Sequence, residues 1–317
     1  MDNERGSKVV IIGAGLVGST FAYSLMINGV VSEIVMLDVN QERLAGEVMD
    51  LNHGISFVRP VTVRAGSYND CGDADVIVIT AGASQKPGES RIDLLVRNTA
   101  IFKDIIDKIK AAGSKAIILV ATNPVDIMTY ITYKLSGFPA QRVIGSGTVL
   151  DSSRFRYLLS THCNVDPSNI HAYIIGEHGD TEVPVWSLAN IAGIRFVEYC
   201  PVCSEPCCHE LPKDQIFNEV KNAAYQIIKG KGATYYAIGL ALVEIVESII
   251  RDEYSVLTVS SLLTGEYGLE DVCLSLPAIV NRKGIVKKIK MALSPEEEAG
   301  FRNSGQVLKE LQRQLEI

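Results

Sequence analysis

The chain has no excess of basic residues. Its 30 lysines and arginines are outnumbered by 37 aspartates and glutamates, which gives a net charge of −7 over 317 residues. A nucleic-acid-binding protein would normally carry a basic field, so we expect no nucleic-acid partner. A negative net charge is still compatible with local basic pockets that bind acidic metabolites.

A bilayer-spanning run and a secretory leader are missing as well. The apolar stretches are short and end at glycines, so we expect no membrane segment. No charged and apolar leader precedes the first apolar stretch at residues 9–12, so we expect no secretory signal. The seven cysteines are an odd number in a chain large enough to fold without disulfides, which favours a reducing cytoplasm.

Apolar residues, by contrast, are ample: 47% of the chain is hydrophobic and 21% is charged, which suits a substantial core. Strands are predicted at residues 9–12, 34–37, 61–65, 76–79, 116–120 and 143–144, and helices at residues 19–28, 41–50 and 92–111. This alternation predicts a parallel, doubly wound sheet with residues 143–144 as its last strand.

The alternation is lost after about Asp151. Strands are predicted at residues 170–175, 256–262 and 272–279, and helices at residues 211–229, at 233–251 and from Ser294 onward. The predicted fold class is α/β. A Rossmann-type doubly wound parallel sheet in residues 1–145 is followed by an α+β domain in residues 146–317, which carries substrate, catalysis and oligomer contacts.

Three glycines lie between the first predicted strand and the first predicted helix. Gly13, Gly15 and Gly18 have the G-x-G-x-x-G spacing, in which the backbone can approach a pyrophosphate at a helix N-terminus. Glycine turns also serve simple packing, so the motif alone is weak. Asp38 closes the second strand, where a carboxylate accepts from both ribose hydroxyls and repels a 2′-phosphate. The three glycines and Asp38 together favour NAD over NADP as the cofactor.

A glycine-flanked histidine, His178, ends an apolar run and stands between two acids. It can donate a proton, Asp151 can orient it, and Arg154 can hold an acid substrate. Each residue also has a structural explanation. A lone histidine is usually hydrogen-bonded in a core, Asp151 can cap a helix, and Arg154 can be its surface partner. The functional interpretation is favoured because the three occur together with nucleotide-type loops.

Two polar loops follow predicted strands. Residues 82–91 are glycine-rich and can either close over a site as a lid or form an ordinary surface loop. Residues 121–126 would lie at the carboxyl edge of the sheet, where ligands bind in this architecture. The alternative for them is a strand-to-helix turn in which Asn123 satisfies the backbone.

These motifs together resemble those of the bacterial-type L-lactate dehydrogenases in the lactate/malate dehydrogenase superfamily. The similarity runs from residue 9 to about residue 311. It rests on Gly-Ala-Gly-Leu-Val-Gly at 13–18, Gln-Lys-Pro-Gly-Glu-Ser-Arg at 85–91, Thr-Asn-Pro-Val-Asp at 122–126, Gly-Ser-Gly-Thr at 145–148, Asp-Ser-Ser-Arg at 151–154, Gly-Glu-His-Gly-Asp at 176–180 and Gly-Ala-Thr-Tyr-Tyr at 232–236. It implies reversible reduction of pyruvate to L-lactate with NADH. A malate dehydrogenase and a non-catalytic NAD-binding relative are the alternatives.

The resemblance also implies residue roles. His178 would donate a proton to the pyruvate carbonyl and, in reverse, accept the proton of the lactate hydroxyl. Asp151 would bind the other ring nitrogen and stabilise the imidazolium. Arg154 would grip the substrate carboxylate bidentately, while Arg91 would arrive with the lid and polarise the carbonyl.

Further positions follow from the same resemblance. Asn123, Asp126 and Thr234 are implied to contact the substrate. The implied cofactor contacts are Gly13, Gly15, Val17, Gly18, Asp38, Arg43, Tyr68, Gly82, Ala83, Thr122, Asn123 and Ser146. The family's chemistry needs no metal ion.

Gln85 favours pyruvate over oxaloacetate. The matching lid position of malate dehydrogenases resembles an arginine that pairs with the second carboxylate of the substrate. A neutral glutamine can pack beside a methyl group, but it would leave a buried carboxylate unpaired and costly.

Arg156 and His171 resemble the fructose 1,6-bisphosphate site that bacterial relatives share across a symmetry axis. On a helix, Arg156 is about 200° from Arg154, so the two guanidiniums face apart. The resemblance implies a sugar-bisphosphate-activated homotetramer, a dimer of dimers, in which a polyanion neutralises facing cationic residues. The alternative is a surface arginine and a structural histidine.

Residues 198–209 depart from the family, in which this stretch is a mostly polar loop. Cys200 and Cys203 have C-x-x-C spacing, and two adjacent cysteines and a histidine follow. Four sulfurs can hold zinc, but adjacent cysteines are awkward ligands for one tetrahedron and there is no second C-x-x-C. We therefore expect thiols in a surface loop and no metal.

Overall fold

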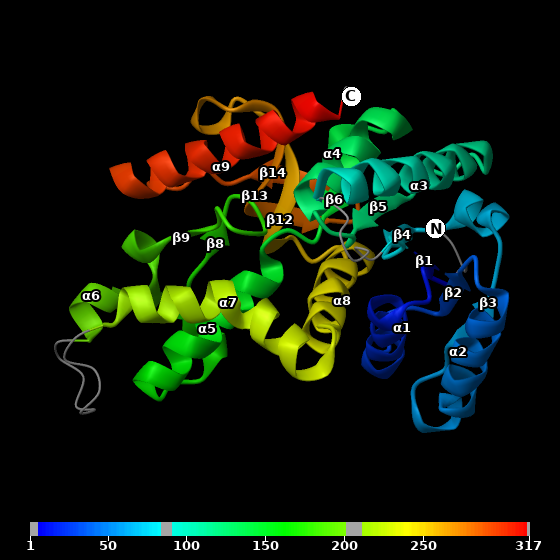
Figure 1. The fold of residues 1–317 in the computed structure, drawn as a ribbon. Helices are drawn as coiled ribbons and strands as arrows, with labels where there is room; N and C mark the ends of the chain where they lie inside the picture. Colours follow the sequence, from blue (N-terminus) through cyan, green and yellow to red (C-terminus); the bar gives the residue numbers. More distant parts are fainter. Residues whose placement is uncertain (1–5, 84–90, 201–210, 316–317) are drawn as a thin grey trace.

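The computed structural model describes residues 6–83, 91–200 and 211–315 (Figure 1). Within these ranges the centre of the molecule is a nine-stranded sheet with the order β14-β13-β12-β6-β5-β4-β1-β2-β3. Helices cover both faces of this sheet, and the two remaining small sheets lie beside it in the C-terminal half.

Six parallel strands make up the N-terminal part of the large sheet. They are β1 (Lys8–Ile12), β2 (Glu33–Leu37), β3 (Thr62–Ala65), β4 (Val76–Ile79), β5 (Ile117–Val120) and β6 (Val143–Gly145). Near-continuous runs of buried Val, Ile and Leu explain why β1, β4 and β5 are strands covered on both faces, whereas β3, at the sheet edge, is largely exposed. The order of the six strands, 3-2-1-4-5-6, is the Rossmann arrangement, and the predicted doubly wound sheet is confirmed.

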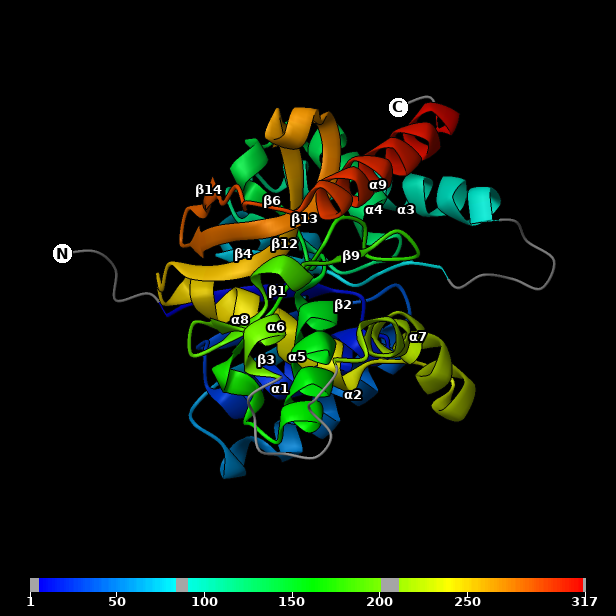
Figure 2. The same ribbon diagram turned by 90° about the vertical axis from the view of Figure 1, so that its left-hand side faces the viewer.

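Alternate residues of β1 belong to different cores. Val9 and Ile11 pack in one hydrophobic cluster, whereas Val10 and Ile12 pack in another. The first cluster lies under α1 (Leu16–Asn28), α2 (Gln41–His53) and α8 (Tyr236–Ile250). The second lies under α3 (Arg91–Ala111), α4 (Val125–Ser136) and α9 (Pro295–Gln314), which Figure 2 shows on the opposite side of the sheet.

The sheet does not end at β6. Three antiparallel strands, β12 (Ser255–Thr264), β13 (Glu270–Asn281) and β14 (Gly284–Lys288), continue it, because Ser260 of β12 pairs with Gly145 of β6. Residues 143–144 thus belong to the last parallel strand, as predicted, but the antiparallel continuation beyond it was not predicted. Two long apolar strands from the C-terminal half extend the sheet edge instead of forming a sheet of their own.

The predicted strand at residues 170–175 is divided in two. β7 (Ile170–His171) joins a small sheet with β10 (Asn190–Ile191) and β11 (Ile194–Arg195), whereas β8 (Ile174–Ile175) pairs with β9 (Val183–Pro184). Ile170, Ile174 and Ile175 are all buried, but the two pieces have different partners. Sequence periodicity carries no signal for a change of partner.

A third core lies in the C-terminal half. It is built from one face each of α5 (Val149–Cys163) and α7 (Lys213–Lys231), together with α6 (Phe196–Tyr199) and the β7 sheet. The last helix, α9, begins after Ser294 in a capping box with Glu297, as its sequence predicts. The 3₁₀ turns are η1 (Ile55–Phe57), η2 (Tyr68–Asp73), η3 (Ala140–Arg142), η4 (Pro167–Asn169), η5 (Trp186–Leu188) and η6 (Glu266–Gly268). In the part of the chain that the structure describes, every helix is too short or too polar to cross a membrane.

Candidate active site

A cavity of about 290 Å³ lies where the parallel sheet meets the C-terminal half. Its wall includes Asn123 from the β5–α4 connection, Asp151 and Arg154 from α5, and His178 and Glu182 from the turn between β8 and β9. Residues of α3 and α7 complete the wall. Segments more than a hundred residues apart in the sequence thus bring an imidazole, carboxylates and a guanidinium into one space.

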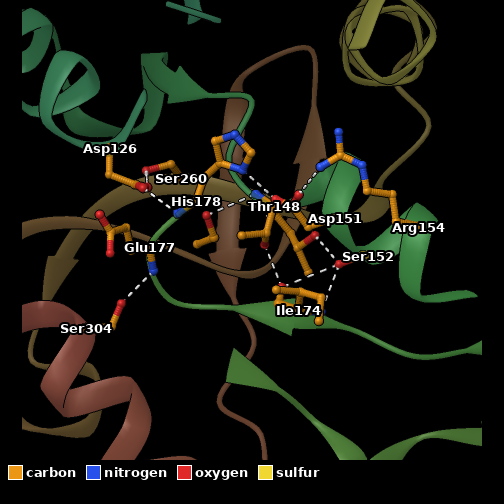
Figure 3. A network of polar contacts seen from close by, with 12 residues as sticks. Asp126, Thr148, Asp151, Ser152, Arg154, Ile174, Glu177, His178, Ser260 and Ser304 are labelled. Atoms are coloured by element: carbon orange, nitrogen blue, oxygen red, sulfur yellow. Dashed lines mark hydrogen bonds and ion pairs between the residues drawn. The ribbon is translucent and has the colours of Figure 1, made fainter. Parts of the chain in front are cut away.

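His178 and Asp151 form the central contact of this cavity. The Nδ1 atom of His178 lies 2.5 Å from Oδ2 of Asp151, and Oδ1 of Asp151 accepts a hydrogen bond of 2.7 Å from Nη1 of Arg154 (Figure 3). The carboxylate is almost wholly buried in the first turn of α5. One buried carboxylate therefore serves both cationic groups and fixes the imidazole with Nε2 on the far side of the ring.

The pKa values of this pair follow from its surroundings. Burial alone would lower the pKa of His178, but the negative charge of Asp151 and its hydrogen bond raise that pKa to about 9. Burial alone would raise the pKa of Asp151, but the charges of His178 and Arg154 keep it below its usual range. The imidazole is consequently protonated at neutral pH.

The backbone around His178 is held by a second carboxylate. Asp126, in the first turn of α4, accepts a hydrogen bond of 2.7 Å from the N–H of His178 and one of 2.5 Å from the Ser260 hydroxyl. Its burial raises the pKa of Asp126 to about 7, although both bonds favour the charged form. The structure places Asp126 behind His178, and it is not among the residues that line the cavity.

The neighbouring backbone is fixed as well. The N–H of Glu177 donates to the hydroxyl of Ser304 on α9 over 2.7 Å, and Gly176 pairs with Ser275 of β13. Gly176 has φ +90°, and a Cβ at this position would lie 2.9 Å from the Ser304 hydroxyl oxygen. This close approach explains why a glycine precedes the acid and the histidine.

The glycine turn after β1 forms an open cradle. Gly13 has φ +111°, and a Cβ on Gly18 would lie 1.9 Å from the carbonyl oxygen of Gly13, so both positions require glycine. A Cβ on Gly15 would meet nothing within 4 Å, and no side chain caps the N-terminus of α1. These residues fit a pyrophosphate, because the backbone is open at Gly15 and the first turn of α1 has no side-chain cap.

Asp38 stands at the end of β2 beside this cradle. Its carboxylate accepts hydrogen bonds from the backbone N–H groups of Ala14, at 2.7 Å, and Asn40, at 2.8 Å. The side chain is only partly buried, so it keeps room for further contacts. Both the glycine turn and the acid thus fit the adenosine half of a dinucleotide with a free 2′-hydroxyl.

The remaining predicted cofactor positions follow the carboxyl ends of the parallel strands. Thr122 donates from its hydroxyl to the carbonyl of Ala81 over 2.7 Å, and the N–H of Ala83 donates to Asn98 over 2.8 Å. Val17, Arg43, Tyr68, Gly82 and Ser146 lie in α1, in α2, at the start of η2, after β4 and after β6. All therefore lie in the connections, or in the first turns of the helices, that follow the carboxyl ends of the parallel strands.

Other predicted residues lie elsewhere or outside the described residues. Thr234 lies between α7 and α8 and does not line the cavity. Gln85 lies outside the described residues, as does the side chain of Arg91, whose backbone begins α3. Arg156 points away from the cavity, and its Nε donates to the carbonyl of Ala172, next to the exposed His171.

Glu182 is a site residue that the sequence interpretation missed. Its side chain is buried in the cavity wall, and Oε1 has no hydrogen-bond partner among the described residues. Burial, and then the negative charge of Asp151, raise the pKa of Glu182 to about 8, so it is mostly a neutral acid at pH 7. The only sequence signal is its position four residues after His178, which by itself indicates nothing.

Comparison with known proteins agrees with this geometry. The sequence profile described as "lactate/malate dehydrogenase, NAD binding domain" matches residues 7–145, and that described as "lactate/malate dehydrogenase, alpha/beta C-terminal domain" matches residues 148–316. An L-lactate dehydrogenase of Acetivibrio thermocellus is 58% identical over 316 residues, which are 100% of this chain and 99% of that protein. One of Thermoanaerobacter pseudethanolicus is 55% identical, over 98% of this chain and 100% of that protein.

Solved structures are similar over the whole fold. A lactate dehydrogenase from a Medee basin deep-sea metagenome library has a TM-score of 0.96 at 42% identity, covering 99% of this chain and 100% of that chain. The minor L-lactate dehydrogenase of Enterococcus mundtii, in its ligand-bound form, has a TM-score of 0.93 at 43% identity, covering 97% and 98%. Residues 7–145 thus form an NAD-binding domain, and the chain belongs to the lactate/malate dehydrogenase family.

Proposed function

We propose that this protein is an NAD-dependent L-lactate dehydrogenase, which reversibly reduces pyruvate to L-lactate. The observation that carries this proposal is the His178–Asp151 contact of 2.5 Å in a cavity shared with Arg154, at the cofactor-binding edge of the sheet. Relatives at 50–58% identity are named L-lactate dehydrogenase, which supports the same activity here.

The proton chemistry belongs to His178. Because the pKa of this imidazole is raised to about 9, it is an acid at neutral pH and can give its Nε2 proton to the carbonyl oxygen of a 2-oxo acid. NADH, when bound, supplies the hydride to the carbonyl carbon. The neutral imidazole that remains is the base for the hydroxyl of the product in the reverse direction, while Asp151 stabilises the charged form.

Arg154 suits the carboxylate of the substrate. The Nη1 group of Arg154 donates to Asp151, and the remaining N–H groups of this guanidinium can form a bidentate pair with a carboxylate. Asp151 thereby holds the anion-binding group and the proton donor in one fixed relation. We assign residues 1–145 to cofactor binding and residues 146–317 to substrate binding, catalysis and assembly.

A direct spectrophotometric assay with two substrates tests the activity. Purified protein with NADH is expected to lose NADH absorbance on addition of pyruvate, and to lose it far more slowly with oxaloacetate. The reverse preference would identify a malate dehydrogenase. Absence of turnover with either acid, at full NADH binding, would identify a non-catalytic relative.

Gln85 is proposed to set the preference for pyruvate. It is neutral, so it would leave the second carboxylate of oxaloacetate unpaired in a closed site. Gln85→Arg is expected to move the ratio of kcat/KM values toward oxaloacetate. An unchanged ratio would reject this assignment.

An anionic effector site is proposed at Arg156 and His171, for fructose 1,6-bisphosphate. Arg154 faces the cavity, whereas Arg156 contacts the Ala172 carbonyl and stacks on Tyr173 with 5.6 Å between guanidinium and ring centre. The two arginines are thus separated as the helix geometry requires. The sugar bisphosphate is expected to lower the KM for pyruvate in the wild type and not in Arg156→Ala.

The proposed assembly is a homotetramer, a dimer of dimers, in the cytoplasm. The free, buried thiols of Cys71 and Cys273 support a reducing compartment. Sedimentation with and without fructose 1,6-bisphosphate tests the assembly, since an effector shared across a symmetry axis must shift the equilibrium toward the tetramer. A sedimentation profile that the effector leaves unchanged would contradict this.

A further inference from the structure

Three metal-ligating side chains meet at the end of α5 farthest from the active site. His162 and Cys163 close the last turn of α5, and Cys200 follows α6 directly. One imidazole nitrogen and the two Sγ atoms all lie within 4.8 Å of one another. Eleven residues of helix separate this cluster from Asp151, which corresponds to about 16 Å along the axis.

The local fold brings this cluster together. The αL conformation of Asn164, with φ 51°, ends α5 directly after Cys163. The N–H of Cys200 donates to the carbonyl of Phe196 over 3.0 Å, which holds the end of α6. Cys163 and Cys200 are 3% and 2% exposed in the third core, whereas His162 stands at its half-buried rim. Two distant segments therefore present their ligands to one buried point.

The ligand chemistry selects a particular class of cation. Two thiols and an imidazole, with no carboxylate in the cluster, are a set that suits zinc and does not suit calcium or magnesium. A zinc ion with two thiolates and a neutral imidazole has no net charge, so it can lie at the edge of an apolar core.

The distances require only a small contraction. With Zn–S near 2.3 Å and Zn–N near 2.0 Å, tetrahedral ligand atoms lie about 3.5 to 3.8 Å apart. Starting from separations of up to 4.8 Å, the atoms of this cluster must then approach one another by about 1.3 Å at most. Rotation of side chains at the ends of two helices can supply this movement.

We propose that His162, Cys163 and Cys200 bind one Zn²⁺ ion that clamps α6 to the end of α5. Binding forms two Zn–S bonds and one Zn–N bond, and the two thiols release their protons to solvent. The fourth position is left for a solvent or other exogenous ligand. The role is structural, because the cluster touches neither the cofactor edge nor the cavity.

The proposal differs from the sequence expectation of no metal. That expectation considered only residues 198–209, of which Cys203, Cys207, Cys208 and His209 lie outside the described residues. His162 and Cys163 were not considered, because their spacing from Cys200 matches no short zinc motif. Only the fold shows that they meet.

Cobalt substitution tests the site on the full chain. The reduced, chelator-treated protein is expected to bind one Co²⁺ per chain, with thiolate-to-cobalt charge-transfer bands, and to release it to an equivalent of Zn²⁺. His162→Gln, Cys163→Ser and Cys200→Ser should each weaken zinc binding by about tenfold or more, measured by competition with a chromophoric chelator. Circular dichroism and NADH-dependent turnover verify that each variant is folded.

A matched variant separates this site from the neighbouring cysteines. The combined variant Cys203→Ser, Cys207→Ser, Cys208→Ser and His209→Asn should keep the charge-transfer bands and the zinc affinity. Loss of both in this variant, with retention in Cys163→Ser and Cys200→Ser, would overturn the proposal.

A measurement on the unaltered protein covers the case in which a variant does not fold. Zn²⁺ should slow the alkylation of Cys163 and Cys200, read as labelled peptides by mass spectrometry, and leave that of Cys273 unchanged. Equal labelling rates of Cys163 and Cys200 with and without Zn²⁺ would also overturn the proposal.

Discussion

The two carboxylates that hold His178 both lie in the first turn of a helix, yet their electrostatic surroundings differ. Asp151, in the first turn of α5, lies between an imidazole and a guanidinium, and its pKa is lowered. Asp126, in the first turn of α4, faces a hydroxyl and a backbone N–H, and burial raises its pKa to about 7. The comparison teaches that neighbouring charges, not residue type or helix position, decide which acid can stabilise a reacting cation.

Removing the charge of Asp151 should have the largest effect. Asp151→Asn takes away the anion that raises the pKa of His178, so burial would then lower that pKa and favour the neutral ring. We expect kcat for pyruvate reduction at pH 7 to fall by about 10²- to 10⁴-fold. Steady-state kinetics at several pH values measure this. A fall without any shift of the pH profile to lower pH would contradict the electrostatic role.

Arg154→Lys should reduce kcat/KM for pyruvate by about 10²-fold, mainly through KM. A lysine keeps the positive charge beside Asp151 but cannot form a bidentate pair with a carboxylate. The comparison with Asp151→Asn separates substrate grip from proton donation, since only the latter should change the pH profile. An unchanged KM would show that the guanidinium does not hold the substrate.

The pH profile of the wild type should follow His178. Its pKa is raised to about 9, so the acid form needed for reduction is full below that pH. Above pH 9, kcat/KM for pyruvate should fall about tenfold per pH unit, while lactate oxidation should increase up to the same pH. A fall that begins near pH 6.5 would mean that Asp151 does not raise this pKa.

Asp126→Asn should reduce kcat/KM by less than about tenfold at pH 7. An asparagine can still accept from the His178 N–H, and the carboxyl group it replaces is about half neutral at this pH. Asp126→Ala is the matched test, because it removes the acceptor altogether and should be clearly worse. Equal losses in Asp126→Asn and Asp151→Asn would break the contrast between the two acids.

The smallest effect on catalysis is expected at Ser304. Ser304→Ala leaves the buried N–H of Glu177 without its acceptor, which should lower the free energy of unfolding by about 1 to 3 kcal/mol. Thermal denaturation measures this, with the exposed Ser153→Ala as control. A wild-type Tm for Ser304→Ala would show that solvent replaces the bond.

The strands of the parallel half could be predicted to within one residue at each end, whereas helix α4 was not predicted. These strands are continuous apolar runs between turn signals, because helices cover both faces of the sheet. The antiparallel half could not be predicted in this way. The pairing of β12 with β6 and the division of residues 170–175 into two strands depend on partners distant in sequence. Long-range pairing has no local signature.

The candidate site shows the same limit. Motifs indicated His178, Asp151 and Arg154, and the structure brings these three side chains together. Neither the backbone role of Asp126 nor the neutral acid at Glu182 could be inferred, because both depend on burial. The meeting of Cys163 with Cys200 likewise depends on the packing of two separate helices.

The pairing of Ser260 with Gly145 has a mechanical consequence. Both halves share one hydrogen-bonded sheet, to which the glycine turn and the segments that orient the imidazole are attached. The two halves therefore do not separate by a hinge motion. A reactant must therefore enter through movement of the connections and helices that cover this sheet. The glycine turn after β1 and the segment of His178, which is tied to β13 through the bridge between Gly176 and Ser275, are thus held in one frame before any ligand arrives.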